Sequence, residues 1–229
     1  MKGLFITAVG TEIGKTLVTA LLCRQLISQG RGVRALKPVV SGCSDDDPQS
    51  DPARILRALG RAPTPEAVDE IAPWRFAEPV SPHLAARREG RTVALEKVVA
   101  FCRRADDADV RLVEGAGGIM SPIVDGATCL DVIEALGDPV VLVTGTYLGA
   151  ISHTLTAIEA LKARGGGLAG IIVSESIPDA GFEDMMESLR EFVQCGAAII
   201  PLPRISGDVE ARWFDAPDLT GMLGICPIE

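Results

Sequence analysis

Residues 7 to 16 read TAVGTEIGKT, and this stretch limits the possible folds more than any other part of the chain. An apolar run, GLFIT, leads into it, and a helix-like segment begins at Lys15. A strand, a glycine-rich turn and a helix N-terminus together make a site where backbone N–H groups converge on phosphate. The sequence therefore predicts a phosphate-binding loop, in which Lys15 reaches the outer phosphates and the Thr16 hydroxyl binds magnesium.

The spacing of this loop differs from the usual Gly-x-x-x-x-Gly-Lys-Ser/Thr pattern. Five places before Gly14 the chain has Val9 instead of glycine, and Gly10 is the other glycine close by. Glycine is needed where φ is positive or where phosphates touch the backbone. We expect Gly10 and Gly14 to meet that need in a loop of altered length, and Ala8 to keep an ordinary negative φ. The alternative is a chance Gly-Lys-Thr at a helix start.

Beyond this loop, short apolar runs alternate with helical stretches. Strands are expected over residues 3–7, 33–39, 110–114, 139–144, 168–173 and 197–202, and helices over 15–28, 151–164 and 180–194. This order predicts an α/β fold of three layers, a doubly wound, mostly parallel sheet with helices on both faces. The stretches 43–52 and 61–82 are expected to be irregular. The length of 229 residues fits a single domain over 1–229.

The amino-acid composition argues against several classes of binding partner. The net charge of -9 disfavours nonspecific binding to nucleic acid or to anionic membranes, because both would be repelled. No apolar run reaches the roughly 18 to 20 residues of a membrane span, and no export signal precedes the first strand, so we expect a cytoplasmic protein. His83 and His153 are expected to be packed or surface residues. The cysteines lack metal-ligand spacing and are expected to be buried thiols: Cys23, Cys43, Cys102, Cys129, Cys195 and Cys226.

Side chains suited to phosphate chemistry follow other expected strands. Lys37 and Ser41 lie in LKPVVSG, and Glu114 ends an apolar run before a glycine-rich turn, VEGAGG. Ligands of parallel sheets lie at the carboxyl ends of the strands. Glu114 could therefore hold magnesium opposite Thr16, as a Walker-B acid does, and Asp51 is a third candidate ligand. Each candidate has an alternative without function. Lys37 is then a surface charge, the turn after Glu114 only a strand-to-loop bend, and Asp51 a solvated acid in a loop.

Together these motifs resemble the dethiobiotin synthetase family over most of the chain. The family loop has the form G-T-D-T-E-V-G-K-T, which aligns with AVGTEIGKT at residues 8–16, so one extra residue explains the spacing. Ala8 stands for the family's first glycine and Gly10 for its aspartate. The further matches, in order, are KPVVSG (37–42), SDPARIL (50–56), FAEPVSPHLAA with REG (76–90), VEGAGG (113–118), LGAISH (148–153) and LAGIIV (168–173).

The resemblance implies a P-loop NTPase fold and an ATP- and magnesium-dependent reaction of 7,8-diaminononanoate with carbon dioxide. One amine adds carbon dioxide to form a carbamate, and ATP phosphorylates this carbamate to a carbamic-phosphoric anhydride. The second amine then closes the ureido ring of dethiobiotin and releases phosphate. Lys15, Lys37 and the metal would neutralise the negative charge that builds up in the transition state.

The resemblance also assigns roles to individual residues. It gives catalytic roles to Lys37, Lys15 and Thr11. The residues implied to bind the nucleotide are Glu12, Ile13, Gly14, Lys15, Thr16, Leu17, Asp51, Glu114, Gly115, Ala116, Gly117, Ser174, Glu175, Pro201, Leu202 and Pro203. Those implied to bind the substrate are Ser41, Gly118, Gly149, Ala150, Ile151 and Ser152. The implied magnesium ligands are Thr16, Asp51 and Glu114.

Two departures from the family affect recognition. The family site forms across a two-fold homodimer and receives the substrate carboxylate at the start of the helix in LGAISH, where Ser152 replaces a common asparagine. Ser174 and Glu175 stand where the family often reads adenine with Asn-Asp, and a serine lacks the donor-acceptor pair of an amide. ATP remains the expected nucleotide, with base recognition resting on backbone groups near Pro201, Leu202 and Pro203.

Two other functions fit part of the pattern. An ATP-dependent amidoligase also activates a carboxyl group, but such enzymes usually carry a glutaminase domain with a catalytic cysteine, and this chain has no length left for one. A nucleotide-switched partitioning ATPase has a related loop with a second lysine near its start. This chain has Ala8 and Val9 at that approach.

Overall fold

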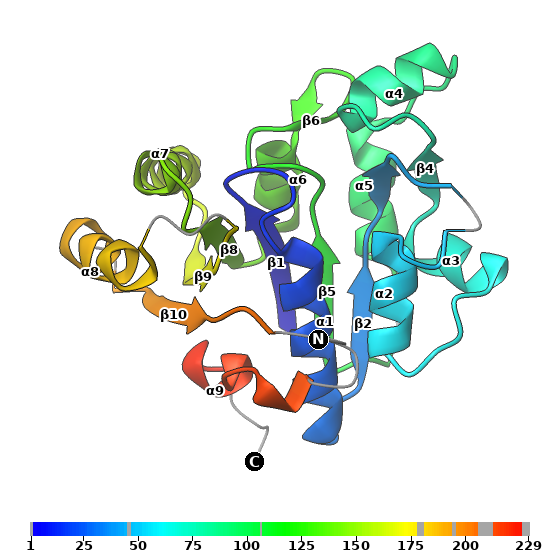
Figure 1. Cartoon of the computed structure of the whole chain (residues 1–229). Coiled ribbons are helices and arrows are strands. Elements are labelled where there is room, and N and C mark those ends of the chain that lie inside the picture. Colours follow the sequence, from blue (N-terminus) through cyan, green and yellow to red (C-terminus); the bar gives the residue numbers. More distant parts are fainter. Residues whose placement is uncertain are drawn as a thin grey trace.

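A six-stranded parallel sheet forms the centre of the computed structural model, which describes residues 2–44, 47–105, 107–177, 181–193, 196–205 and 213–225 (Figure 1). The strand order is β10-β9-β8-β1-β5-β2, and each neighbouring pair is parallel. The predicted parallel α/β fold is therefore confirmed. The strands are β1 (Lys2–Ala8), β2 (Val33–Leu36), β5 (Val110–Glu114), β8 (Val140–Gly145), β9 (Leu168–Ser174) and β10 (Ala198–Leu202).

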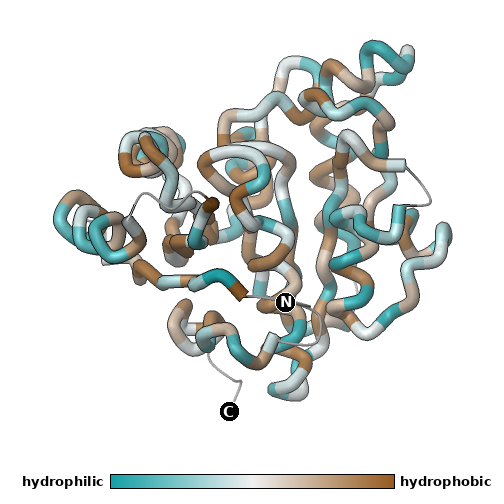
Figure 2. Tube along the Cα trace, in the orientation of Figure 1, coloured by the Kyte–Doolittle hydropathy of each residue, from teal (hydrophilic) through white to brown (hydrophobic). Residues whose placement is uncertain are grey.

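Burial explains why these runs form strands. Every residue of β5 and of β8 is buried, as expected for inner strands of a parallel sheet covered on both faces. Figure 2 shows hydrophobic positions along the strands of the sheet, and hydrophilic positions alternating with hydrophobic ones along the helices α4 (Pro82–Arg88) and α8 (Phe182–Phe192). One buried hydrophobic cluster includes residues from Leu4 to Ile225.

Helices cover the sheet on its two faces. In Figure 1, α1 (Lys15–Ser28) and α9 (Leu219–Met222) lie in front of the sheet, and α5 (Leu95–Cys102) and α6 (Cys129–Leu136) lie behind it. The remaining helices are α2 (Asp51–Ala58), α3 (Pro65–Ile71) and α7 (Ala150–Ala163), with a short 3-10 turn at Trp213–Asp215. No helix in the described ranges is long and apolar enough to cross a membrane.

The strand expected over residues 33–39 was wrong at its end. β2 stops at Leu36, and the chain leaves the main sheet at Lys37, whose backbone N–H donates to Ile71 O at 3.0 Å. Pro38 has no N–H to continue a ladder. A separate short strand, β3 (Val39–Ser41), then pairs with β4 (Trp74–Phe76).

Two stretches expected to be irregular contain regular elements. α2 begins inside 43–52, because the Ser50 side chain accepts from Ala53 N at 3.4 Å and caps the helix. α3 begins inside 61–82 in the same way, with Thr64 as N-cap and Pro65 at the first helical position. A small hairpin of β6 (Pro122–Val124) and β7 (Ala127–Thr128) was also not predicted.

Four of the six cysteines, all expected to be buried thiols, lie in the described part of the chain. The thiols of Cys23, Cys43, Cys102 and Cys129 are free and buried, which confirms the expectation for these four. Cys195 and Cys226 lie outside the described residues.

The C-terminal segment, which the sequence left uninterpreted, is tied to α1 through one buried side chain. Gln25 Nε2 donates to Pro217 O at 2.8 Å, and Gln25 Oε1 accepts from Leu219 N at 2.9 Å and Thr220 N at 3.3 Å. Leu219 and Thr220 are fully buried. The tail therefore returns to the helix that follows the phosphate loop and covers part of its length.

We expect Gln25→Ala to lower the free energy of unfolding by about 2 kcal/mol, because it leaves the buried N–H groups of Leu219 and Thr220 without an acceptor. Urea denaturation at neutral pH measures this change. The matched control is Gln49→Ala, which removes an exposed glutamine and is expected to change stability by about 0.5 kcal/mol or less. Equal stability of the two variants would contradict the anchoring role of Gln25.

Candidate active site

The loop between β1 and α1 has two residues with a positive φ, of which one, Gly14, was expected. Ala8 ends β1 without a positive φ, as predicted, but the positive φ values fall at Glu12 (59°) and Gly14 (95°) and not at Gly10. Glu12 is the one non-glycine residue with a positive φ in the described part of the chain. The structure therefore gives Gly10 no positive φ, and the other role expected for it, a backbone that touches the phosphates, stays a prediction. A Cβ at Gly10 would lie 3.0 Å from Ile13 Cδ1.

Lys15 lies over its own loop. Its Nζ donates to Gly10 O at 2.9 Å, and its side chain is largely buried. Burial, and next the charge of Lys37, lower the pKa of Lys15 to about 8. Since the ammonium bonds only a backbone carbonyl here, an anion that enters the loop is a stronger partner for it.

A second glycine-rich turn, residues 115–118, packs directly against the phosphate loop. A Cβ on Gly118 would lie 3.1 Å from Val9 O and 3.3 Å from Gly10 N, and Gly117 has a φ of 66°. A Cβ on Gly115 would lie 2.6 Å from the sulfur of Cys129. The three glycines of VEGAGG are thus required for different reasons: Gly118 by the close approach of two backbones, Gly117 by its positive φ and Gly115 by the side chain of Cys129.

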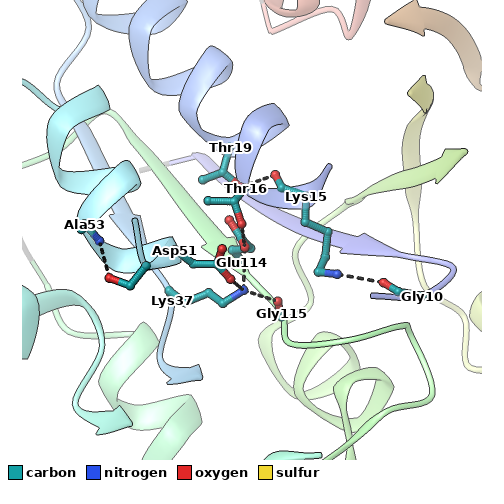
Figure 3. Close-up of polar contacts among 10 residues, drawn as sticks. Gly10, Lys15, Thr16, Thr19, Lys37, Asp51, Ala53, Glu114 and Gly115 are labelled. Atoms are coloured by element: carbon teal, nitrogen blue, oxygen red, sulfur yellow. Dashed lines mark hydrogen bonds and ion pairs between the residues drawn. The ribbon is translucent and has the colours of Figure 1, made fainter. Parts of the chain in front are cut away.

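Beneath the loop, one buried ammonium joins two carboxylates. Lys37 Nζ lies 2.6 Å from Glu114 Oε1, 2.9 Å from Asp51 Oδ2 and 3.1 Å from Gly115 O (Figure 3). Lys37 is 2% exposed and Glu114 fully buried, whereas the Asp51 carboxyl is 39% exposed. The cluster brings together the ends of β2 and β5 and the start of α2.

The ion pairs of this cluster decide the charge of Lys37 and of Asp51. Burial alone would lower the pKa of Lys37, but the charges of Glu114 and Asp51 outweigh it and raise the pKa above its ordinary value. Burial would raise the pKa of Asp51, but the nearby Lys37 ammonium lowers it. The site therefore holds a charged lysine beside ionised Asp51 at neutral pH.

The same carboxylates and a hydroxyl fit a magnesium ion. Thr16 Oγ1 donates to Glu114 Oε1 at 2.8 Å, and Glu114 Oε2 is buried without a hydrogen-bond partner. Within the described ranges no group of three His, Cys, Asp or Glu side chains could hold a metal. Magnesium, however, binds through one or two carboxylates, retained waters and substrate phosphates, so the oxygen set of Thr16, Asp51 and Glu114 suffices.

A cleft of about 710 Å³ opens beside the loop, and seven of the sixteen expected nucleotide-binding residues line it. Four parts of the chain line it: the phosphate loop with Leu17, the segment 174–177 at the end of β9, the residues after β10 from Pro203 to Ile205, and Tyr147 with His153. Thr11, Glu12, Ile13 and Gly14 are among the loop residues that line it.

Pro201 and Leu202 lie inside β10 and are not among the residues that line this cleft. The Leu202 carbonyl already accepts from Glu175 N at 3.1 Å. Glu175 Oε2 in turn accepts from Arg204 N at 2.8 Å, so this carboxylate shapes the backbone next to Pro203.

The expected substrate positions lie on two sides of the loop. Gly149 starts α7 with a φ of 96°, and the first turn of this helix, at Ala150, Ile151 and Ser152, lines a groove of about 590 Å³. Ser41 is part of β3, and its hydroxyl donates to Val80 O at 2.5 Å. The α7 N-terminus presents backbone N–H groups of the kind that bind carboxylates.

The sequence did not identify several residues of the cleft. Tyr147, Arg204 and Ile205 line it, and so does His153, which was expected to be a packed or surface residue. Tyr147 OH lies 2.9 Å from His153 Nδ1. His83, also expected to be packed or at the surface, is half-buried and lies beside Ser81, with Nδ1 3.1 Å from its hydroxyl. The sequence signal for Tyr147 was its place just after an apolar strand.

Comparisons with known proteins agree on one family. A family model described as an AAA domain matches residues 2–206. The ATP-dependent dethiobiotin synthetase BioD of Caulobacter vibrioides is 46% identical over 227 residues, which cover 97% of this chain and 99% of that protein. The protein of the same name from Methylobacterium nodulans is 52% identical over 184 residues, 77% of this chain and 82% of that protein.

Solved structures with low identity show the fold alone. A ParA family ATPase from Chlorobium tepidum TLS superposes with a TM-score of 0.55 at 15% identity, covering 100% of this chain and 94% of that one. Chloroplast FtsY from Physcomitrella patens matches with a TM-score of 0.50 at 14% identity, over 97% of this chain and 64% of the FtsY chain.

We expect Gly118→Ala to weaken binding of magnesium-ATP about tenfold, because the new methyl group presses on the backbone of Val9 and Gly10 and forces the phosphate loop to shift. Calorimetric titration with a non-hydrolysable ATP analogue measures the dissociation constant. The control is Gly167→Ala, whose methyl group would meet Pro139 only at 3.9 Å. Unchanged affinity in both variants would show that contact between the loops does not set the shape of the phosphate site.

Proposed function

Because the chain belongs to the ATP-dependent dethiobiotin synthetase family, we propose how its site closes the ureido ring. Its activity is the ATP-dependent synthesis of dethiobiotin, a ligase reaction of biotin biosynthesis. The observation that carries the mechanism is the buried Lys37 ammonium held beside Glu114 and Asp51, directly under the phosphate loop.

The proposed chemistry has three steps. One amine of 7,8-diaminononanoate attacks carbon dioxide and loses a proton, which gives a carbamate. A carbamate oxygen attacks the γ-phosphorus of ATP, and ADP leaves with the electrons of the broken P–O bond. The second amine then attacks the carbonyl carbon of the carbamic-phosphoric anhydride. The C–O bond to the phosphoryl group breaks, phosphate leaves, and one of the two protons of the attacking nitrogen is lost to solvent while the other stays as the ureido N–H.

The residues of the chain act mainly through charge. The carbamate and the transferred phosphoryl group are both anionic, and little covalent catalysis is needed. Lys15 would exchange its bond to Gly10 O for the outer phosphates, while Lys37 faces the charge that develops between carbamate and phosphate. Thr11, on the exposed loop, lies where it can donate to the same oxygens. Magnesium, held by Thr16, Asp51 and Glu114, would add charge neutralisation for the nucleotide phosphates.

We place the nucleoside of ATP in the cleft beside the loop. There Ser174, Glu175 and Pro203 line the cleft at the ends of the adjacent strands β9 and β10. The turn at Gly115, Ala116 and Gly117 borders the phosphate side, since it packs against the loop. Base recognition then rests on a serine hydroxyl, a carboxylate and backbone groups instead of an amide side chain.

We place the substrate between the two lysines and a second copy of the chain. Ser41 and Gly118 border the reacting end, and the carboxylate is received at the first turn of α7 of the partner copy in a homodimer. Leu148 just before α7 is 94% exposed and Phe192 of α8 is 57% exposed, an apolar surface suited to such an interface. A single cytoplasmic domain over the whole chain completes this proposal.

The alternatives are less well supported. A partitioning-ATPase switch would share the fold, but the curated relatives with substantial identity are synthetases. An amidoligase would need a source of ammonia, and we place no glutaminase site in this chain.

We expect the purified protein to form the ureido product from 7,8-diaminononanoate, bicarbonate, magnesium and ATP, and Lys37→Gln to lower the rate by roughly 100-fold or more, in the range of a single electrostatic contributor. Mass spectrometry of the product measures both rates. Glutamine keeps a donor toward Glu114, so circular dichroism should show a folded variant.

Lys97→Gln is the matched control, since it removes an exposed lysine of α5 and is expected to keep the wild-type rate. Absence of product from the unsubstituted protein would contradict the reaction. A fully active Lys37→Gln would contradict the role of Lys37 alone.

A further inference from the structure

Three consecutive residues at the end of β9 and just after it, 174–176, each contact a different part of the site. The strand ends are level there, because Ser174 pairs in register with Gly145 of β8 on one side and with Leu202 of β10 on the other. Ser174 lies against the phosphate loop: a Cβ on Gly14 would come within 2.9 Å of its hydroxyl oxygen. Glu175 holds the segment after β10 through Arg204 N.

Ser176 makes the third contact, a reciprocal pair with Thr146 after β8. Thr146 N donates to Ser176 Oγ at 3.0 Å, and Ser176 N donates to Thr146 Oγ1 at 3.0 Å. Thr146 is 1% exposed, and a Cβ on Gly145 would lie 2.4 Å from Ser176 Oγ. The two hydrogen bonds thus hold the loops after β8 and β9 at one fixed separation, and the lack of a side chain at Gly145 lets them come this close.

The end of β8 also sets the first turn of α7. The Thr154 hydroxyl donates to Ala150 O at 2.7 Å and lies 2.7 Å from Thr144 Oγ1, so the Thr144 hydroxyl donates to it. Ala150 N donates to Tyr147 O at 3.0 Å. Thr144 and Thr154 are both fully buried. A shift of the loop at Thr146 would therefore be passed on to the α7 N-terminus.

We propose that the Thr146–Ser176 pair couples the nucleoside of ATP held by one copy of the chain to binding of the diamino acid in the partner's site, through the position of the α7 N-terminus that this copy contributes to that site. The proposal rests on the proposed function, which puts the nucleoside against Ser174 and Glu175 and the substrate carboxylate at α7. A nucleoside that fixes the segment 174–176 fixes Thr146 and with it the N–H groups of the first turn of α7. Ser176 lines the nucleoside cleft and Thr146 lines the groove at the start of α7, so their two hydrogen bonds join the walls of the two sites. Toward the diamino acid, Ser176 is a positioning residue, because it acts through Thr146.

A coupling of this kind has a measurable form. Binding energies between two sites are linked reciprocally, and typical couplings change affinity by about 5- to 150-fold. The phosphates can also affect the diamino acid directly, because they lie beside its reacting amines. The contribution of the pair is therefore only the part that depends on the nucleoside.

The test compares two saturating ligands of the phosphate loop by calorimetry. The dissociation constant of 7,8-diaminononanoate is measured with magnesium tripolyphosphate, which has no nucleoside, and with the magnesium complex of the β,γ-imido analogue of ATP. In the unsubstituted protein we expect the analogue to give tighter binding by about fivefold or more. In Ser176→Ala, which removes the acceptor for Thr146 N, we expect this ratio to fall below about twofold.

Two further variants separate positioning from folding. Thr146→Ser keeps the hydroxyl that accepts from Ser176 N and is expected to keep the ratio, whereas Thr146→Val removes it and is expected to lose the ratio. Ser28→Ala is the matched control, because it removes a serine hydroxyl that donates to Gln25 O at 2.8 Å at the far end of α1. It should behave as the unsubstituted protein does.

A ratio near one in the unsubstituted protein, or an equal ratio in Ser176→Ala and Ser28→Ala, would overturn the coupling. Either result leaves formation of the ureido product from ATP intact. Failure of the proposed function would instead show as absence of that product from the unsubstituted protein, so the two failures are distinguishable.

Discussion

The buried ammonium of Lys37 is the interaction on which the rest of the site depends. A charge taken out of water costs several kcal/mol unless partners replace the lost hydration. Glu114, Asp51 and the Gly115 carbonyl do so here, within 2.6 to 3.1 Å. These groups come from different elements, so the charge is tolerated only when β2, β5 and α2 are all in place. The fold and the electrostatics of the site are therefore formed together.

Close backbone contact completes the arrangement. The two glycine-rich turns touch at Gly118 and Gly10, and the loop after β9 touches Gly14 through Ser174. Contacts of this kind place the phosphate loop, the carboxylates and the nucleoside cleft at fixed separations. Because most of the lysine and carboxylate atoms are shielded from water, each charge acts more strongly on an anionic intermediate than it would in solvent. Such preorganised charge suits a reaction in which carbamate and phosphate are both negative.

The sequence predicted the parts of the fold that repeat a local pattern. The strand-loop-helix start and the parallel sheet followed from apolar runs and glycine positions, and the burial of four cysteines from the lack of metal-ligand spacing among them. The end of β2 could not be predicted, because Lys37 N bonds to Ile71, far along the chain, and an apolar Val39 looks like a continuing strand.

The candidate site, like the fold, could be predicted from the sequence only in part. Lys37, Glu114 and Thr16 lie in motifs beside strand ends, and the structure brings them together. The positive φ of Glu12 could not be expected, because glycine is the usual residue there. The Thr146–Ser176 pair has no sequence pattern either, since two hydroxyl residues about 30 places apart meet only through the register of β8 and β9. The tail contact at Gln25 is likewise set by tertiary packing.

A double-mutant cycle on the free energy of unfolding tests the dependence on Lys37 most directly. Urea denaturation at neutral pH is measured for the unsubstituted protein, Lys37→Met, Glu114→Gln and the double variant. Removal of Lys37 alone should destabilise the fold by about 3 kcal/mol, because it leaves a buried carboxylate unpaired. The double variant should recover part of this loss, with a coupling energy of about 2 kcal/mol. Additive effects, within about 0.5 kcal/mol, would contradict the claim that this ion pair holds the site together.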